Sequence, residues 1–239
     1  MVTFEQIKNN DNINTYIESA DITLKSLGFT EHSFQHVGKV ANTVKYILET
    51  LKQDEHDIEI AQIAAYLHDI GNIVNRIEHS QSGAVMAFRI LDNLNMDATD
   101  IAKIISAIGN HDEGTGVPID NISAALILAD KSDVRRSRVR NSDISTFDIH
   151  DRVNYSVVES KLLINDSITE ITLYLKIDTQ FANIMEFFEI FITRMLLCQK
   201  AAAKLGLKFN LVINNQSFLW FTLATVQQMW YYFQVLGSS

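Results

Sequence analysis

The sequence contains a single cysteine, Cys198, and a single proline, Pro118, among its 239 residues. One cysteine excludes a disulfide within the chain, and its place in the apolar run of residues 195–198 indicates a core thiol rather than a nucleophile. Proline interrupts the hydrogen-bond ladder of a helix. Its near absence therefore leaves most of the chain free to form long helices.

Positive charge is also scarce, because 20 lysines and arginines stand against 29 aspartates and glutamates. The formal net charge of −9 argues against a nucleic-acid polymer as partner, since such binding needs a basic surface. It does not exclude a small phosphorylated substrate, because a bound metal ion supplies local positive charge. The first 12 residues lack an apolar run, so we expect no secretory signal and a cytoplasmic protein.

Charged residues are absent after Lys208, and residues 218–236 are strongly apolar and aromatic. This segment is long enough for a membrane anchor. Two glutamines, Gln227 and Gln228, interrupt it, and no lysine or arginine flanks its end, which argues against that interpretation. We therefore expect a packed helix or an interface segment without membrane contact, and the sequence leaves a homo-oligomer open.

Apolar residues recur at helical spacing up to about residue 135, whereas β-branched residues and leucines dominate after about residue 151. The sequence therefore predicts a mainly α fold: a helical bundle over residues 12–150, followed by a small α+β subdomain over residues 151–239 in ββαβ order. The predicted helices span residues 14–27, 33–52, 58–69, 80–94, 97–110, 121–135 and 182–205, and the predicted strands span 157–164, 171–177 and 207–213.

Histidine and aspartate side chains recur on the inward faces of these predicted helices. His68 and Asp69 end the apolar run of residues 60–67, and Gly71 marks a helix stop. A lone core histidine is commonly satisfied by a backbone carbonyl, but a buried carboxylate needs a partner or a metal ion. Mixed imidazole and carboxylate ligands suit iron, manganese, zinc or nickel. The inward residues are His36, His68, Asp69, His79, His111 and Asp130, enough donors for two ions with Asp69 between them.

The order of these residues, and the segments around them, resemble the HD superfamily of metal-dependent phosphohydrolases. Residues 67–71, Leu-His-Asp-Ile-Gly, match its signature. Residues 79–84 resemble its second-metal histidine segment, and residues 128–133 resemble its closing aspartate helix. The resemblance covers about residues 31–140, and it implies that the bundle of residues 12–150 is an HD domain.

The resemblance also assigns roles to individual residues. His68 and Asp69 stand at the implied catalytic centre. His32, four residues before His36, matches a third-metal ligand of some relatives, and a solvent-facing position at the helix start is the alternative. The implied ligands are His36, His68, Asp69 and Asp130 for a first ion, and Asp69, His79 and His111 for a second, with Asp69 as the bridge.

The implied reaction is hydrolysis of a phosphate ester or anhydride in a nucleotide-like substrate, by a hydroxide that two ions make available near neutral pH. The basic residues Lys131, Arg135 and Arg136 are candidates for phosphate binding, because an arginine fork matches phosphate oxygens. A solvated helix end is the alternative interpretation of this basic run. Asp112 and Glu113 are candidate proton donors by position only, and a solvated loop carboxylate is the favoured interpretation of each.

The subfamily, and with it the substrate, stays open. Residues 110–118 resemble a shortened form of the loop in HD-GYP cyclic-di-GMP phosphodiesterases, with departures at Asn72, Asn110 and Val117. The layout also resembles small HD hydrolases that cleave dinucleoside polyphosphates. Two alternatives to hydrolysis remain: a catalytically silent HD-fold signalling or scaffold protein, which the departures favour, and a di-iron oxygenase, since some HD folds hold a di-iron centre.

Overall fold

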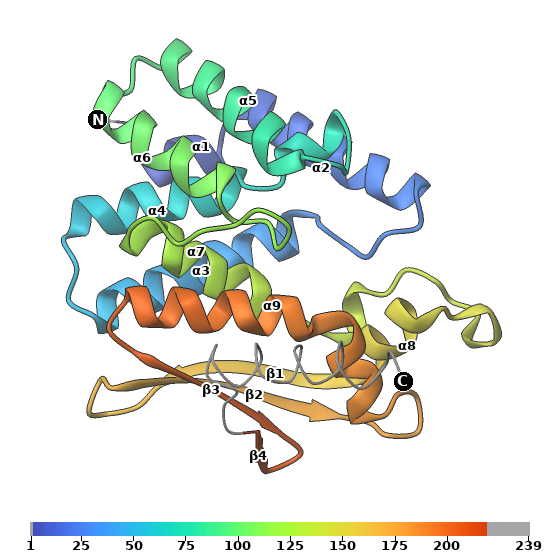
Figure 1. Cartoon of the computed structure of the whole chain (residues 1–239). Coiled ribbons are helices and arrows are strands. Elements are labelled where there is room, and N and C mark those ends of the chain that lie inside the picture. Colours follow the sequence, from blue (N-terminus) through green and yellow to red (C-terminus); the bar gives the residue numbers. More distant parts are fainter. Residues whose placement is uncertain (1, 219–239) are drawn as a thin grey trace, which may run out of the picture.

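The computed structural model describes residues 2–218, and in this part a bundle of helices lies beside a four-stranded sheet (Figure 1). The bundle comprises α1 (Phe4–Lys8), α2 (Asp11–Ser26), α3 (Phe34–Thr50), α4 (Glu55–Leu67), the 3-10 turn η1 (Ile70–Ile73), α5 (His79–Asn93), α6 (Ala98–Gly109) and α7 (Asn121–Ser132). After it come η2 (Arg136–Arg138), η3 (Ile144–Thr146), α8 (Ile149–Ser156), β1 (Val157–Ile164), β2 (Glu170–Ile177), α9 (Ile184–Lys204), β3 (Lys208–Ile213) and β4 (Gln216–Phe218).

Most helices of the bundle begin at a polar side chain that accepts a hydrogen bond from a backbone N–H of the first turn. Helix α5 is different, because its N-cap residue Glu78 makes no such bond and has a left-handed backbone with φ of 56°. Helix α5 therefore begins without a side-chain cap, and it packs against η1. The capping residues of α2, α3, α4, α6 and α7 are Asn10, Ser33, Asp54, Asp97 and Asp120.

Helix α7 is the centre of the molecule. Every residue from 122 to 132 is buried, because α3, α4 and α6 surround the helix on the bundle side and α9 covers it on the other. Such a helix is apolar around most of its circumference. A polar residue on α7, such as Asp130, is consequently held in the interior, where it needs a partner.

The sheet lies under α9, on the side opposite the bundle (Figure 1). Its order is β1-β2-β3-β4, with antiparallel pairs at each end and β2 parallel to β3. Helix α9 makes the crossover between these two parallel strands, as such a connection requires. Buried residues of the bundle, of α9 and of the inner sheet face form one continuous hydrophobic cluster. The domain boundary at residue 150 stays a prediction.

The mainly α fold with a C-terminal ββαβ arrangement is confirmed, and β1 has the predicted limits. The structure adds α1, α8 and β4. Helix α7 ends at Ser132 instead of residue 135, because Asp133 leaves the helical region with ψ of 64°. Helix α4 ends at Leu67, so Gly71, expected as its stop, lies in η1 instead.

The apolar C-terminal segment of residues 218–236 lies, except for Phe218, outside the described residues. Within residues 2–218, no helix combines the length and the apolar character that crossing a membrane requires.

Candidate metal centre

Four histidines and two aspartates from five helices converge beside α7. His36 is in the first turn of α3, and His79 begins α5. The others lie at the C-terminal ends of helices: His68 and Asp69 after α4, His111 after α6 and Asp130 near the end of α7. All six are buried, the most exposed being Asp130 at 9%.

The first end of this cluster consists of His36, His68, Asp130 and one oxygen of Asp69. Oδ2 of Asp69 lies 3.5 Å from Nε2 of His36 and 3.2 Å from Nε2 of His68. Oδ1 of Asp130 lies 3.4 Å and 3.7 Å from the same two nitrogens. Neither Nε2 has a hydrogen-bond partner, although both are buried. Unpartnered buried nitrogens are costly, so the four atoms fit a cation placed between them.

The second end consists of His79, His111 and the other oxygen of Asp69. Oδ1 of Asp69 lies 3.4 Å from Nε2 of His79 and 3.9 Å from Nε2 of His111. The two Nε2 atoms are 3.2 Å apart. Asp69 therefore presents one carboxylate oxygen to each end of the cluster, which is the arrangement that a bridging ligand needs.

The opposite ring nitrogen, Nδ1, is bonded in all four histidines. A carbonyl or carboxylate oxygen can only accept, so Nδ1 carries a proton in each ring, and Nε2 is the nitrogen that faces the cluster. Two lone pairs that face each other at the second end repel unless a cation lies between them. The Nδ1 acceptors are Oδ2 of Asp133 for His36 (2.8 Å), the carbonyl of Ala65 for His68 (2.7 Å), that of Arg76 for His79 (3.1 Å) and that of Ile108 for His111 (2.6 Å).

The proton equilibria of the cluster follow from burial and from the two carboxylates. Burial lowers the pKa of His79, and it lowers the pKa of His111 further, so both rings are neutral near pH 7. Burial also acts on His68, but the Asp69 and Asp130 carboxylates outweigh it and raise the pKa of His68 to about 10. Without an ion, the first end therefore attracts a proton, which is the response of a site built for positive charge.

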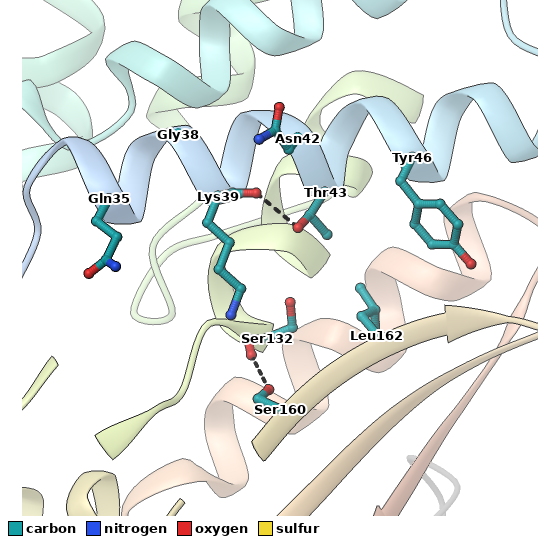
Figure 2. A pocket seen from close by; sticks show the side chains of 9 residues that line it. All are labelled: Gln35, Gly38, Lys39, Asn42, Thr43, Tyr46, Ser132, Ser160 and Leu162. Carbon is teal, nitrogen blue, oxygen red and sulfur yellow. Dashed lines mark hydrogen bonds between the residues drawn. The ribbon is translucent and has the colours of Figure 1, made fainter. Parts of the chain in front are cut away.

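Asp133, just beyond α7, holds His36 in place. Its Oδ2 accepts the Nδ1 proton of His36, and its Oδ1 lies 2.7 Å from Nζ of Lys39. Burial would raise the pKa of Asp133, but His36 and Arg138 hold it well below its usual range. Figure 2 shows Lys39 reaching from α3 across a groove of about 520 Å³ toward Ser132, between α3 and β1.

A second chain of charges joins the cluster to α9. Nζ of Lys131 lies 2.7 Å from Oδ2 of Asp130 and 3.4 Å from Oε2 of Glu113. Nε of Arg194, on α9, lies 2.7 Å from Oε1 of the same glutamate. Burial would raise the pKa of Glu113, but Lys131 and Arg194 hold it well below its usual range. Glu113 is therefore ionised near pH 7 and has no proton to donate to a leaving group.

A cavity of about 520 Å³ opens beside the cluster. Asp69, Asp130 and the two second-end histidines line it, together with apolar residues of two different parts of the chain. His32 lines it as well: it precedes α3, and its Nδ1 is bonded to the carbonyl of Thr30 at 2.7 Å. The cations around the cavity are Arg76, Lys131, Arg138 and Arg194, and the apolar residues include Leu27, Phe29, Ile190 and Phe191.

Arg135 and Arg136, two of the three predicted phosphate-binding residues, do not line this cavity. Because α7 ends at Ser132, both arginines belong to the segment that leaves the helix. Arg135 lies 3.1 Å from Glu31 and 3.0 Å from Asp133. Arg136 donates to the carbonyl of Tyr155 and lies 3.1 Å from Asp178. Of the predicted basic residues, only Lys131 is at the site, and the sequence interpretation did not include Arg76, Asp133 or Arg194.

Gly71 allows the two ends of the cluster to meet. A Cβ atom at this position would lie 2.0 Å from the carbonyl oxygen of His79 and 2.4 Å from the backbone nitrogen of Gly83. Any side chain would therefore push η1 away from α5. The glycine keeps Asp69, just before η1, beside His79 at the start of α5.

Comparisons with known proteins cover the same part of the chain. Residues 33–145 match the family model described as the HD domain. The uncharacterized protein MJ1020 of Methanocaldococcus jannaschii is 27% identical over 160 residues, a match that spans 57% of this chain and 61% of that relative. The crystal structure of a predicted HD superfamily hydrolase from an uncultured Thermotogales bacterium is 24% identical, with a TM-score of 0.41, and the match covers 56% of this chain and 75% of the other.

Proposed function

The chain belongs to the HD-domain family over residues 33–145, and from this premise we propose that it hydrolyses a phosphate ester or anhydride in a nucleotide-like substrate with two divalent metal ions. The observation that carries the proposal is the position of Asp69, whose two oxygens face two separate groups of imidazole Nε2 atoms. Iron, manganese, zinc and nickel all accept such mixed ligands.

The ions, when bound, would supply Lewis acidity and a hydroxide nucleophile near neutral pH. The chain's own residues would bind the ions and orient the substrate. His36, His68 and Asp130 would hold the first ion, His79 and His111 the second, and Asp69 both. Around them, the cations of the cavity wall attract phosphate oxygens, and α9 closes one side of the cavity with Ile190 and Phe191.

The cavity supports a small phosphorylated substrate with an organic part. It is lined by the ligand cluster and by arginine and lysine side chains, which suits phosphate. The same cavity is also lined by Leu27, Phe29 and Phe191, which suits a planar or apolar group such as a nucleobase. We therefore keep a nucleotide-like compound as the proposed substrate class.

The test starts with elemental analysis of the protein as purified, followed by removal of metal with a chelator. The metal-free protein is then reloaded with iron, manganese, zinc or nickel and assayed on nucleotides, simple phosphate esters and anhydrides. We expect about two ions per chain, with hydrolysis that the chelator abolishes and one of these metals restores. A protein that binds no transition metal and shows no metal-stimulated cleavage would falsify the proposal.

Asp69→Ala removes the shared ligand. We expect loss of both ions and a fall in turnover on the order of a thousandfold or more, since several kcal/mol of transition-state stabilisation disappears. Asp166→Ala, at an exposed position in the β1–β2 turn, is the matched control. Circular dichroism establishes that both variants fold. Loss of partner binding without any turnover in the parent protein would support a scaffold, and an iron-specific, oxygen-dependent product would support an oxygenase.

A further inference from the structure

Arg76 differs from the other three cations around the cavity. Lys131 is paired with Asp130 and Glu113, and Arg194 is paired with the same glutamate. Arg138 lies 3.7 Å from a carboxylate oxygen of Asp133 and donates to the Asp133 carbonyl at 2.7 Å. Within residues 2–218, no carboxylate lies within ion-pair distance of Arg76. Arg76 is therefore the one cation of this cavity whose charge is not balanced by an acidic side chain within the described residues.

The guanidinium of Arg76 lies at the second end of the ligand cluster. Its Nη1 is 3.4 Å from Nε2 of His79 and donates to Oδ1 of Asn72 at 3.2 Å. The amide of Asn72 in turn donates to Oδ1 of Asp69 at 3.0 Å, so Asn72 joins the arginine to the shared carboxylate. The guanidinium carbon lies 5.5 Å from the centre of the Phe29 ring, which supports its flat face.

The rest of the guanidinium remains available. Nε and Nη2 of Arg76 have no hydrogen-bond partner among the described residues, whereas Arg194 and Arg138 use Nε for Glu113 and for the carbonyl of Glu31. A half-buried cation without a counter-charge is unfavourable until an anion arrives. The side chain is therefore positioned for an anion that enters the cavity beside the second end.

We propose that Arg76 binds the phosphate group of the substrate and makes the site selective for a terminal phosphate, that of a phosphomonoester or of an anhydride end, over an internal diester. This inference rests on the proposed function. A guanidinium fork takes two phosphate oxygens. A terminal phosphate has three non-bridging oxygens and two negative charges, so it meets the fork and still presents an oxygen to the ligand cluster. A diester has two non-bridging oxygens and one negative charge, so it can bind fully to the guanidinium fork or to the ligand cluster, but not to both.

The experiment compares four proteins: the parent, Arg76→Ala, Arg76→Lys and the control Arg89→Ala. Arg89 is an exposed arginine of α5, 3.9 Å from Asp92 and outside the cavity. Each protein is assayed for kcat and KM on a nucleoside monophosphate and on a diester of the same nucleoside. Each is also titrated with inorganic phosphate by calorimetry, in metal-loaded and chelator-treated forms. Metal content and thermal unfolding show that the variants are intact.

We expect Arg76→Ala to lower kcat/KM for the monoester on the order of 10- to 100-fold, the factor for one or two hydrogen bonds from a charged donor. The loss on the diester should be much smaller, so the preference for the monoester shrinks. Arg76→Lys should restore part of the rate, since it keeps the charge without the fork. Inorganic phosphate should bind about tenfold more weakly to Arg76→Ala, and Arg89→Ala should behave as the parent.

The outcomes separate this inference from the proposed function. Unchanged phosphate binding in Arg76→Ala, or equal losses on monoester and diester, overturns the role of Arg76 while hydrolysis by the parent protein stands. If the parent cleaves neither compound but its phosphate affinity still depends on Arg76, the proposed hydrolysis fails and the phosphate-binding role of Arg76 is supported. A parent protein that neither cleaves nor binds phosphate overturns both.

Discussion

The two ends of the ligand cluster share Asp69 but differ in charge and in access. The first end adds a second carboxylate, Asp130, and its imidazoles, His36 and His68, are fully buried and do not line the cavity. The second end adds only neutral imidazoles, and both of these line the cavity. A tightly enclosed, more negative end therefore lies behind a more open and less negative one.

This difference indicates that the two ends have different roles. A divalent ion is held more strongly where two carboxylates and two imidazoles enclose it than where one carboxylate oxygen meets two imidazoles. The open end has Arg76 beside it, so the phosphate of the proposed substrate would enter there. We infer that the first end serves mainly to retain its ion, and that the second end serves mainly to meet substrate.

The comparison is tested most strongly by removing one ligand from each end. Asp130→Asn should empty the first end, and His79→Asn should empty the second while leaving one ion per chain. We expect turnover to fall at least a hundredfold in both variants, because each loses several kcal/mol of metal-dependent stabilisation. Elemental analysis and dialysis against a chelator measure which ion remains and how tightly. If the ion that survives His79→Asn dissociates more readily than the ion that survives Asp130→Asn, the proposed ranking of the two ends is wrong.

A smaller effect is expected from Asp133→Asn. The change removes the carboxylate that accepts the Nδ1 proton of His36, and such outer partners typically contribute 10- to 100-fold to metal affinity. The loss should be confined to the first end. Competition with a coloured chelator measures both ions separately, and Asp92→Asn, an exposed aspartate of α5, is the control. Equal weakening at both ends would mean that Asp133 supports the fold as a whole and has no specific role at one end.

The smallest expected effect is the release of a proton from His68 when the first ion binds. The pKa of His68 is raised to about 10 in the metal-free protein, above its unfolded value, so the ring is protonated and contributes stability at neutral pH. This contribution is lost as the pH rises through about 10, and an ion entering the first end must displace the proton. Calorimetry at pH 8 in buffers of different ionisation heat should show about one proton released with the first ion, and metal affinity should rise with pH. Release of no proton would contradict the assigned electrostatics.

The sequence could predict that the six cluster residues lie together, because helical periodicity shows which residues of each helix face the core. His68 and Asp69 follow an apolar run, and His111 and Asp130 stand at helical spacing from buried residues. When several helices each turn one polar residue inward, the common core places those residues together. No comparable pattern marks Arg76, which lies in the irregular segment between η1 and α5.

The positions that sequence reasoning placed elsewhere, or missed, depend on contacts distant in the chain. Arg194 was expected within a helix, but its pairing with Glu113 spans 81 residues and leaves no local signal. Arg135 and Arg136 appeared to extend the basic end of a helix, whereas the chain turns away at Asp133. That aspartate supports His36 across 97 residues, and a spacing rule does not reveal such a partner.

The four bonded Nδ1 atoms have a consequence for the choice of metal. Each imidazole is fixed by an acceptor at 2.6–3.1 Å before any ion arrives, so the rings cannot turn freely to suit the ion. A cluster that is rigid in advance loses little rotamer entropy on binding, and it selects by size and preferred geometry more than by ligand softness. Discrimination among iron, manganese, zinc and nickel would then follow ionic radius. The groups that impose this selection are three backbone carbonyls and the Asp133 carboxylate, which bond the far side of the rings.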